Sequence, residues 1–223
     1  MARTLIVTGG HGALGSAVCK AARAQGWNVA LIDHAEAEAP EGVFEVGGVD
    51  LTDAASTNAA VARIAAHFGG VDALFNIAGG FVWQTVDAAE PAWDRMYRMN
   101  VVTALNASRA ALPHLKASTA GRIVNVGAGG AVKAAAGMGA YAASKAGVHR
   151  LTEALAEELK GSTVTVNAVL PSIIDTAANR RDMPDADFDR WVKPEQLAAV
   201  MLFLASPEAA AVTGALIPVT GGV

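Results

Sequence analysis

The stretch RTLIVTGGHGALGSAV, residues 3–18, decides the fold class. An apolar run leads into a glycine-rich turn, and a helical pattern begins at Ala13. In a turn of this kind one glycine permits the tight bend, a second lets backbone approach a pyrophosphate, and a third allows close packing of helix on strand. The N-terminus of the following helix offers unpaired N–H groups to phosphate. The stretch therefore predicts the strand, loop and helix of a dinucleotide site.

An acidic residue at the end of the next strand supports this prediction. Asp33 stands 18 residues after Gly15, where a carboxylate can accept hydrogen bonds from both ribose hydroxyls and would repel a 2′-phosphate. The residues that follow, 34–36, include no Arg or Lys that could bind such a phosphate. We therefore expect the cofactor to be NAD(H) in preference to NADP(H). The alternative is that the glycines form plain turns and that Asp33 simply ends a strand.

Short apolar strands alternate with Ala-rich helical patterns along the rest of the chain. Strands are expected within 3–10, 28–33, 42–50, 71–80, 121–128, 162–171 and 215–222. Helices are expected at about 13–25, 54–68 (capped by Thr52 or Asp53), 91–97, 101–115, around 141–145, and 194–206. Nearly continuous apolar strands separated by helices indicate a parallel sheet covered on both faces. We predict one domain, 1–223: an α/β, Rossmann-type doubly wound parallel sheet of about seven strands.

Composition narrows the function classes. The chain has 223 residues, 52% hydrophobic and only 17% charged, with a formal net charge of −4. Such a balance argues against a nucleic-acid or an anionic-membrane surface. Cys19 is the only cysteine, which excludes an internal disulfide, fits a reducing compartment and predicts a packed thiol. With neither a signal-like start nor an apolar run of the ~18 residues that a span needs, we expect a cytoplasmic protein, and we predict no metal site.

Tyr141 and Lys145 are the candidate chemical groups. Residues four apart share one face of a helix, so the phenol and the ammonium are expected to be neighbours. A nearby cation favours the phenolate and would move the pKa of Tyr141 down from its usual ~10. The pair therefore predicts a proton donor, with the alternative that Tyr141 is a packed aromatic and Lys145 reaches past it to solvent.

These features together resemble the short-chain dehydrogenase/reductase family. The matching motifs run in order along residues 3–222: Thr8-Gly9…Gly15, Asn76-x-Ala78-Gly79, Asn100 and Tyr141-x-x-x-Lys145. The resemblance implies that Tyr141 exchanges the proton, that Lys145 tunes it and binds the nicotinamide ribose, and that Asn100 supports a proton-relay water. It also implies a small-molecule substrate and a homodimer or homotetramer. The cofactor residues it implies are Gly9, Gly10, Gly12, Ala13, Leu14, Gly15, Asp33, Asp50, Leu51, Asn76, Ala78, Gly79, Pro171, Ile173 and Thr176.

One position departs from the family pattern. The usual member has a serine thirteen residues before the tyrosine, and Ala128 stands there. Losing one donor to a developing oxyanion costs ~2.7–4 kcal/mol in enzymes that need it. Either this chain is impaired as a ketone reductase, or its substrate does not need the hydroxyl.

The dihydropteridine reductase branch of the family resembles this chain at the same point. The shared features are GGHGALGS in the cofactor loop, IAGG at 77–80, Ala128-Gly129, Gly137-Met138, and a stretch containing Leu170-Pro171, Asp175-Thr176, Asn179-Arg180, Met183-Pro184, Ala186-Asp187-Phe188 and Trp191.

That resemblance implies hydride transfer to an activated planar imine or quinoid, with 171–193 as a substrate lid. The expected substrate pocket comprises Ala128, Phe81, Trp83, Tyr97 and Met138. Two alternatives stay open: a ketone or 3-oxoacyl reductase that works without the serine, and a dinucleotide-binding sensor without turnover.

Overall fold

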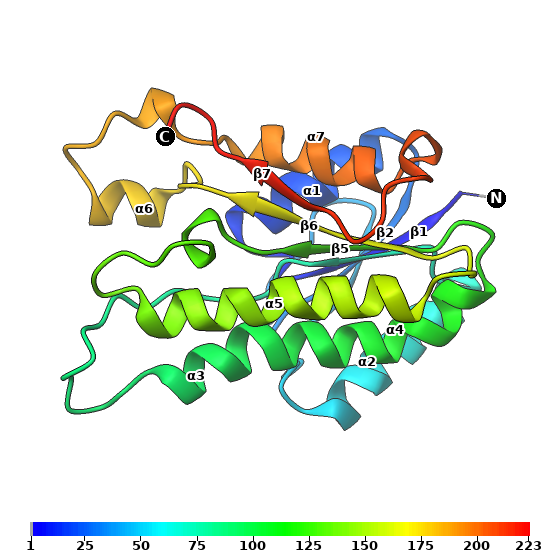
Figure 1. Ribbon diagram of the computed structural model, residues 1–223. Coiled ribbons are helices and arrows are strands. Elements are labelled where there is room, and N and C mark those ends of the chain that lie inside the picture. The colour runs from blue at the N-terminus through cyan, green and yellow to red at the C-terminus, as the bar shows by residue number, and fades with distance from the viewer. Residues whose placement is uncertain (1) are drawn as a thin grey trace.

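A single seven-stranded sheet forms the centre of the protein, in a computed structural model that describes residues 2–223. All strands are parallel and follow the order β3-β2-β1-β4-β5-β6-β7 (Figure 1). The strands are β1 (Thr4–Thr8), β2 (Asn28–Ile32), β3 (Val43–Val46), β4 (Ala73–Asn76), β5 (Arg122–Val126), β6 (Thr165–Pro171) and β7 (Leu216–Val219). Every residue of β1, β4, β5 and β6 is buried, which explains why these strands are mostly apolar and show no strict alternation of apolar and polar residues.

Helices cover both faces of the sheet. Helices α1 (Ala13–Ala24) and α7 (Pro194–Leu204) lie on one face, and α2 (Ala54–Phe68), α4 (Thr103–Ala117) and α5 (Gly139–Glu158) lie on the other (Figure 1). Each face closes its own apolar core, one around Val18 and Leu197 and the other around Ile64 and Leu115. The predicted doubly wound α/β class is confirmed.

The structure settles the cap of α2. The Asp53 carboxylate accepts hydrogen bonds from the backbone amides of Ala55 and Ser56, so Asp53 and not Thr52 is the cap. The helix ends at Gly69, whose φ of 81° is the left-handed conformation that glycine adopts without strain.

The two helices expected at 91–97 and 101–115 were wrongly separated. They form one continuous run of α3 (Trp93–Tyr97), the π-helix η1 (Arg98–Val102) and α4. No Pro or Gly stands between the two patterns, so nothing breaks the helix, and the wider turn of η1 absorbs the change in phase. Asn100 is buried on this π turn, a feature frequent at functional sites.

The polar segment after β6 is folded back on itself. It contains α6 (Ala177–Asp182) and a short 3-10 helix, η3 (Phe188–Arg190). Arg180 forms a bidentate pair with Asp175 (2.6 and 2.7 Å), and its guanidinium lies 4.6 Å from the Phe188 ring centroid. A bridge between Ile174 and Val192 closes the base of the segment. Two further 3-10 turns are η2 (Gly129–Ala131) and η4 (Pro207–Ala209).

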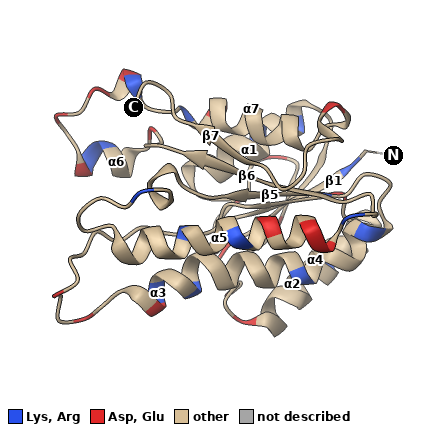
Figure 2. Cartoon of the chain, in the orientation of Figure 1, with Lys and Arg blue, Asp and Glu red and all other residues tan. Residues whose placement is uncertain are grey.

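The strand order reverses between β1 and β4. The chain winds from β1 to one edge of the sheet and from β4 to the other, so a crevice opens at their carboxyl ends. Lys and Arg residues are scattered among Asp and Glu rather than gathered on one element (Figure 2). Within residues 2–223, no helix is long and apolar enough to cross a membrane.

Candidate active site

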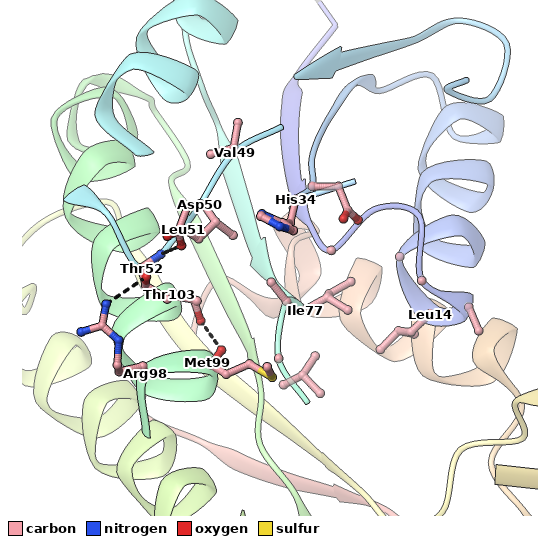
Figure 3. A pocket seen from close by; sticks show the side chains of 18 of the residues that line it. Leu14, His34, Val49, Asp50, Leu51, Thr52, Ile77, Arg98, Met99 and Thr103 are labelled. Atoms are coloured by element: carbon pink, nitrogen blue, oxygen red, sulfur yellow. Dashed lines mark hydrogen bonds between the residues drawn. The ribbon is translucent and has the colours of Figure 1, made fainter. Parts of the chain in front are cut away.

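A cavity of about 810 Å³ lies at this crevice. Figure 3 shows its lining, with His34 beside Asp50 on one side and Leu14 beyond Ile77 on the other. Eleven predicted cofactor residues line it: Gly9, Gly12, Ala13, Leu14, Gly15, Asp33, Asp50, Leu51, Ala78, Gly79 and Thr176. Its size fits a ligand pocket, which typically measures ~300–1,000 Å³.

The glycine-rich loop is shaped to admit a ligand. Gly9 has a φ of 69°, and a Cβ there would approach the Cα of Ala78 to 2.9 Å. A Cβ on Gly15 would overlap the carbonyl oxygen of Gly9. At Gly12 the nearest atom would be 3.3 Å away, and no side chain caps the first turn of α1. The loop therefore leaves open backbone and unclaimed helical N–H groups, which fit a pyrophosphate.

Asp33 ties this loop to the end of β2. One carboxylate oxygen accepts from the His11 amide (3.0 Å) and the other from the Ala35 amide (3.1 Å). The His11 imidazole in turn lies 2.9 Å from the Glu45 carboxylate on β3. That pair was not predicted, because only the sheet brings residues 11 and 45 together.

Polar groups gather at the far end of the cavity. Hydrogen bonding from Thr52 lowers the pKa of the Asp50 carboxyl, and the nearby His34 and Arg98 charges lower it further. The Arg98 guanidinium donates to the Thr52 hydroxyl at 3.2 Å (Figure 3). Arg98 comes from η1, 46 residues along the chain, and no local motif points to it.

Four residues predicted for the cofactor lie outside the lining. Gly10 faces β2, where a Cβ would come within 2.5 Å of Leu31. Asn76 is buried and its side-chain amide donates to Asn125 and Ser108. Pro171 ends β6 and pairs with β7 in the sheet. The Ile173 carbonyl accepts a hydrogen bond from the Val192 amide, and the neighbouring residue, Ile174, lines the cavity instead.

Thr8 is a positioning residue that the predicted site omitted. Its hydroxyl oxygen accepts from the backbone amides of Ile77 (3.0 Å) and Ala78 (3.1 Å). The last residue of β1 thus holds the turn that follows β4. The Thr8-Gly9 motif of the sequence contains this residue and could have indicated its role.

Asn100, Gly79 and Lys145 come together from three elements. A Cβ on Gly79 would overlap the Asn100 Oδ1 and lie 3.5 Å from the Lys145 Nζ. Asn100 exchanges hydrogen bonds with the backbone of Gly80 (3.0 and 3.1 Å) and donates to the Ser144 hydroxyl (2.9 Å). Ser144 also donates to the Tyr141 carbonyl, which ties η1 to the start of α5. Ser144 was not predicted.

The electrostatics of Tyr141 differ from expectation. Burial raises the pKa of the Tyr141 phenol to about 12, the reverse of the predicted lowering. Burial also lowers the pKa of the Lys145 ammonium to about 8. Desolvation is the cause of both pKa shifts, and the Lys145 Nζ donates to the Val126 carbonyl (2.8 Å). The phenol is therefore protonated at neutral pH.

Ala128 is not among the residues that line the cavity, and it offers no free polar group. Ala128 is 4% exposed, its amide donates to the His149 Nε2 (3.3 Å), and its carbonyl accepts from the Ala131 amide (3.2 Å). Both backbone groups are thus used inside the protein, and the side chain is a methyl group.

Aromatic side chains surround the N-terminal end of α5. The Phe81 ring packs edge-on against Tyr141, with centroids 4.9 Å apart. Trp83 lies over Gly137, where any Cβ would overlap the indole, and Met138 reaches the position of a Cβ on Gly130 at 3.0 Å. Phe81, Trp83 and Tyr97 are each more than half exposed. Met138 is half-buried, and these four predicted pocket residues are here called the aromatic rim: Phe81, Trp83, Tyr97 and Met138; the fifth, Ala128, is buried.

Comparisons with known proteins agree with this geometry. The family model described as short chain dehydrogenase matches residues 3–187. Galactitol 2-dehydrogenase (L-tagatose-forming) of Cereibacter sphaeroides is 35% identical, over 97% of this chain and 92% of that protein. Acetoacetyl-CoA reductase of Rhizobium meliloti is 32% identical, over 100% and 98%. The structure of Thermoplasma acidophilum aldohexose dehydrogenase superposes with a TM-score of 0.91 at 24% identity, covering 99% and 93%, and shows the shared fold.

The family match and the cavity lead to the same conclusion. The match spans the glycine-rich loop, the turn after β4, Tyr141 and Lys145, and the loop leaves the room that a dinucleotide pyrophosphate needs. The chain belongs to the short-chain dehydrogenase/reductase family of NAD(P)-dependent oxidoreductases.

Proposed function

We propose that this protein is an NADH-preferring reductase of an activated planar imine or quinoid, of the kind reduced by dihydropteridine reductases. The observation that carries the proposal is the absence of a free hydrogen-bond donor at position 128. Ala128 has no side-chain donor, and its amide is already bound to His149. A carbonyl substrate would lack its usual hydrogen bond there, whereas a quinonoid dihydropterin is electrophilic without one and needs chiefly a proton.

Tyr141 supplies that proton in our proposal. The phenol is protonated at neutral pH, as a donor in the reductive direction must be, although burial raises its pKa to about 12 and so makes it a weaker acid than an unperturbed tyrosine. Lys145 is charged below about pH 8 and lies one helical turn away. Asn100 anchors the Gly79–Gly80 turn against α5 through Ser144. The bound nicotinamide supplies the hydride.

Two further features support the substrate and cofactor assignments. The aromatic rim beside Tyr141 offers flat apolar surface for a bicyclic ring. The Asp33 carboxylate stands at the end of β2 in the cavity lining, where it would repel a 2′-phosphate. We propose 171–193 as the substrate lid, and the folded segment α6–η3 supports that assignment.

The relatives favour a second candidate, a ketone or 3-oxoacyl reductase. Galactitol 2-dehydrogenase and acetoacetyl-CoA reductase are named for alcohol and ketone chemistry. A ketone oxygen would then be held by Tyr141 and an ordered water rather than by residue 128.

A substrate panel separates the candidates. NADH consumption is followed with quinonoid dihydropterin, acetoacetyl-CoA and simple ketones, and each assay is repeated with NADPH. We expect kcat/KM for the pterin to exceed that for the ketones by at least about tenfold, roughly 1.4 kcal/mol. The reverse order would favour the ketone reductase. NADH binding without turnover of any substrate would favour a sensor.

The assembly and the compartment are also proposals. We propose a homodimer or homotetramer in the cytoplasm. The Ala-rich helices beside Tyr141 suit close packing between subunits, and the buried thiol of Cys19, whose pKa burial raises to about 12, suits a reducing compartment. Light scattering of the purified protein tests the assembly, with a monomer as the contradicting result.

A further inference from the structure

His149 has no part in the proposed chemistry, yet it lies behind it. The residue is buried on α5, 4% exposed, four residues after Lys145 and eight after Tyr141. At 3.6 residues per turn, the three side chains share one face of the helix. Tyr141, Lys145 and His149 therefore face the same side, toward the end of β5.

Lys145 binds the last residue of β5, Val126, and His149 binds Ala128, two residues further along. The Lys145 Nζ donates to the Val126 carbonyl at 2.8 Å, and the Ala128 amide donates to the His149 Nε2 at 3.3 Å. Between them, a Cβ on Gly127 would lie only 2.5 Å from the His149 Nε2. Glycine at 127 is therefore what allows the imidazole to reach the backbone.

The ring must be neutral to play this part. A ring nitrogen accepts a hydrogen bond only when it carries no proton, so the proton of His149 resides on Nδ1. Burial lowers the pKa of the His149 imidazole, and the Arg150 and Lys145 charges lower it further against an opposing effect of Glu153. The environment thus stabilises the accepting form.

We propose that His149 is a positioning residue for the substrate side of the active site, a role that rests on the proposed function. By holding the Ala128 amide inside the protein, it fixes the 126–128 backbone beside Tyr141 and turns only the Ala128 methyl group toward the substrate. The geometry of residues 126–128 then depends on a helix side chain rather than on residue 128 itself.

A matched pair of variants tests the proposal through turnover. His149→Leu removes the acceptor, and His149→Gln keeps one in its side-chain oxygen. With the best substrate of the wild type, we expect kcat to fall roughly 10- to 100-fold in His149→Leu, as for a displaced reacting group. We expect recovery to within about threefold in His149→Gln, with the NADH dissociation constant unchanged in both. Equal losses in the two variants would overturn the proposal.

A second measurement is independent of turnover. Hydrogen exchange of the Ala128 amide should be slow in the wild type and in His149→Gln, and at least about tenfold faster in His149→Leu. If the wild type reduces nothing on the panel, the proposed function fails, but this measurement still tests whether His149 holds the Ala128 amide. Equal exchange rates in all three proteins would refute the positioning role of His149, even if the pterin is reduced.

Nitrogen NMR of the wild type covers the case in which His149→Leu does not fold. The chain has five histidines, so the signals lost in His149→Gln identify residue 149. We expect a neutral ring with its proton on Nδ1. A ring protonated on Nε2 could not accept from Ala128 and would contradict the proposal.

Discussion

The cofactor half and the substrate half that we propose for the site are built differently. The cofactor half, at the ends of β1, β2 and β4, is made largely of backbone: the Gly9–Gly15 loop and the turn after β4. The substrate half, around the start of α5, is made of side chains that reach in from separate loops and helices. A backbone turn requires particular residues at neighbouring positions, so it can be recognised in a short stretch of sequence. A group of side chains from separate elements comes together only in the complete fold.

The largest expected effect is confined to the substrate half. Tyr141→Phe removes the phenolic proton while keeping the ring against Phe81. We expect kcat for reduction to fall by about 10²–10⁴-fold, the contribution of a positioned acid. The NADH dissociation constant should stay within about twofold, because no part of the glycine loop changes. A kcat near that of the wild type would show that Tyr141 is not the proton donor.

Burial of the same phenol predicts a titration. Its folded-state pKa of about 12 lies above the unfolded value of 10.0. The contribution of this group to folding is therefore present below pH 10 and is lost as pH rises toward about 12. Tyr97 is the only other tyrosine, so the difference in tyrosinate absorbance between wild type and Tyr141→Phe isolates Tyr141. Titration at or below pH 10 would contradict this account.

Two glycines of the cofactor half should separate stability from binding. Gly9→Ala places a Cβ at a positive φ and against Ala78, so we expect a loss of about 1–2 kcal/mol or more in the free energy of unfolding. Gly12→Ala meets no atom closer than 3.3 Å and should lose less than about 0.5 kcal/mol. The Gly12 variant should nevertheless bind NADH more weakly.

Denaturant unfolding and NADH titration measure both effects. Equal stability losses in the two variants would show that the loop is not shaped as described.

The smallest expected effect concerns the choice of dinucleotide. Asp33→Asn removes the charge that would repel a 2′-phosphate and keeps an oxygen that can accept from the His11 or Ala35 amide. We expect the NADH-to-NADPH ratio of kcat/KM to fall about tenfold, roughly 1.4 kcal/mol. An unchanged ratio would mean that another group sets the preference. Arg98→Gln is the variant to compare, since Arg98 lies at the same cavity.

The cofactor half could be predicted from the sequence more fully than the substrate half, because local motifs are visible in a sequence and long-range contacts are not. The glycine loop, Asp33 and the Ala78-Gly79 turn could be predicted because each is a short motif tied to one strand end. Arg98, Ser144 and His149 could not, because their partners lie 46, 44 and 21 residues away. The error over the pKa of Tyr141 has a similar origin, since its burial depends on packing that no four-residue spacing contains.

The most direct test of the central claim is Ala128→Ser, which restores the hydroxyl that the family pattern places there. The quantity to measure is the ratio of kcat/KM for quinonoid dihydropterin to that for acetoacetyl-CoA, in wild type and variant, with NADH. We predict that the serine leaves pterin reduction unchanged or slower and improves the ketone by about tenfold at most. A wild type that reduces the ketone faster than the pterin, with a further gain from the serine, would contradict the claim.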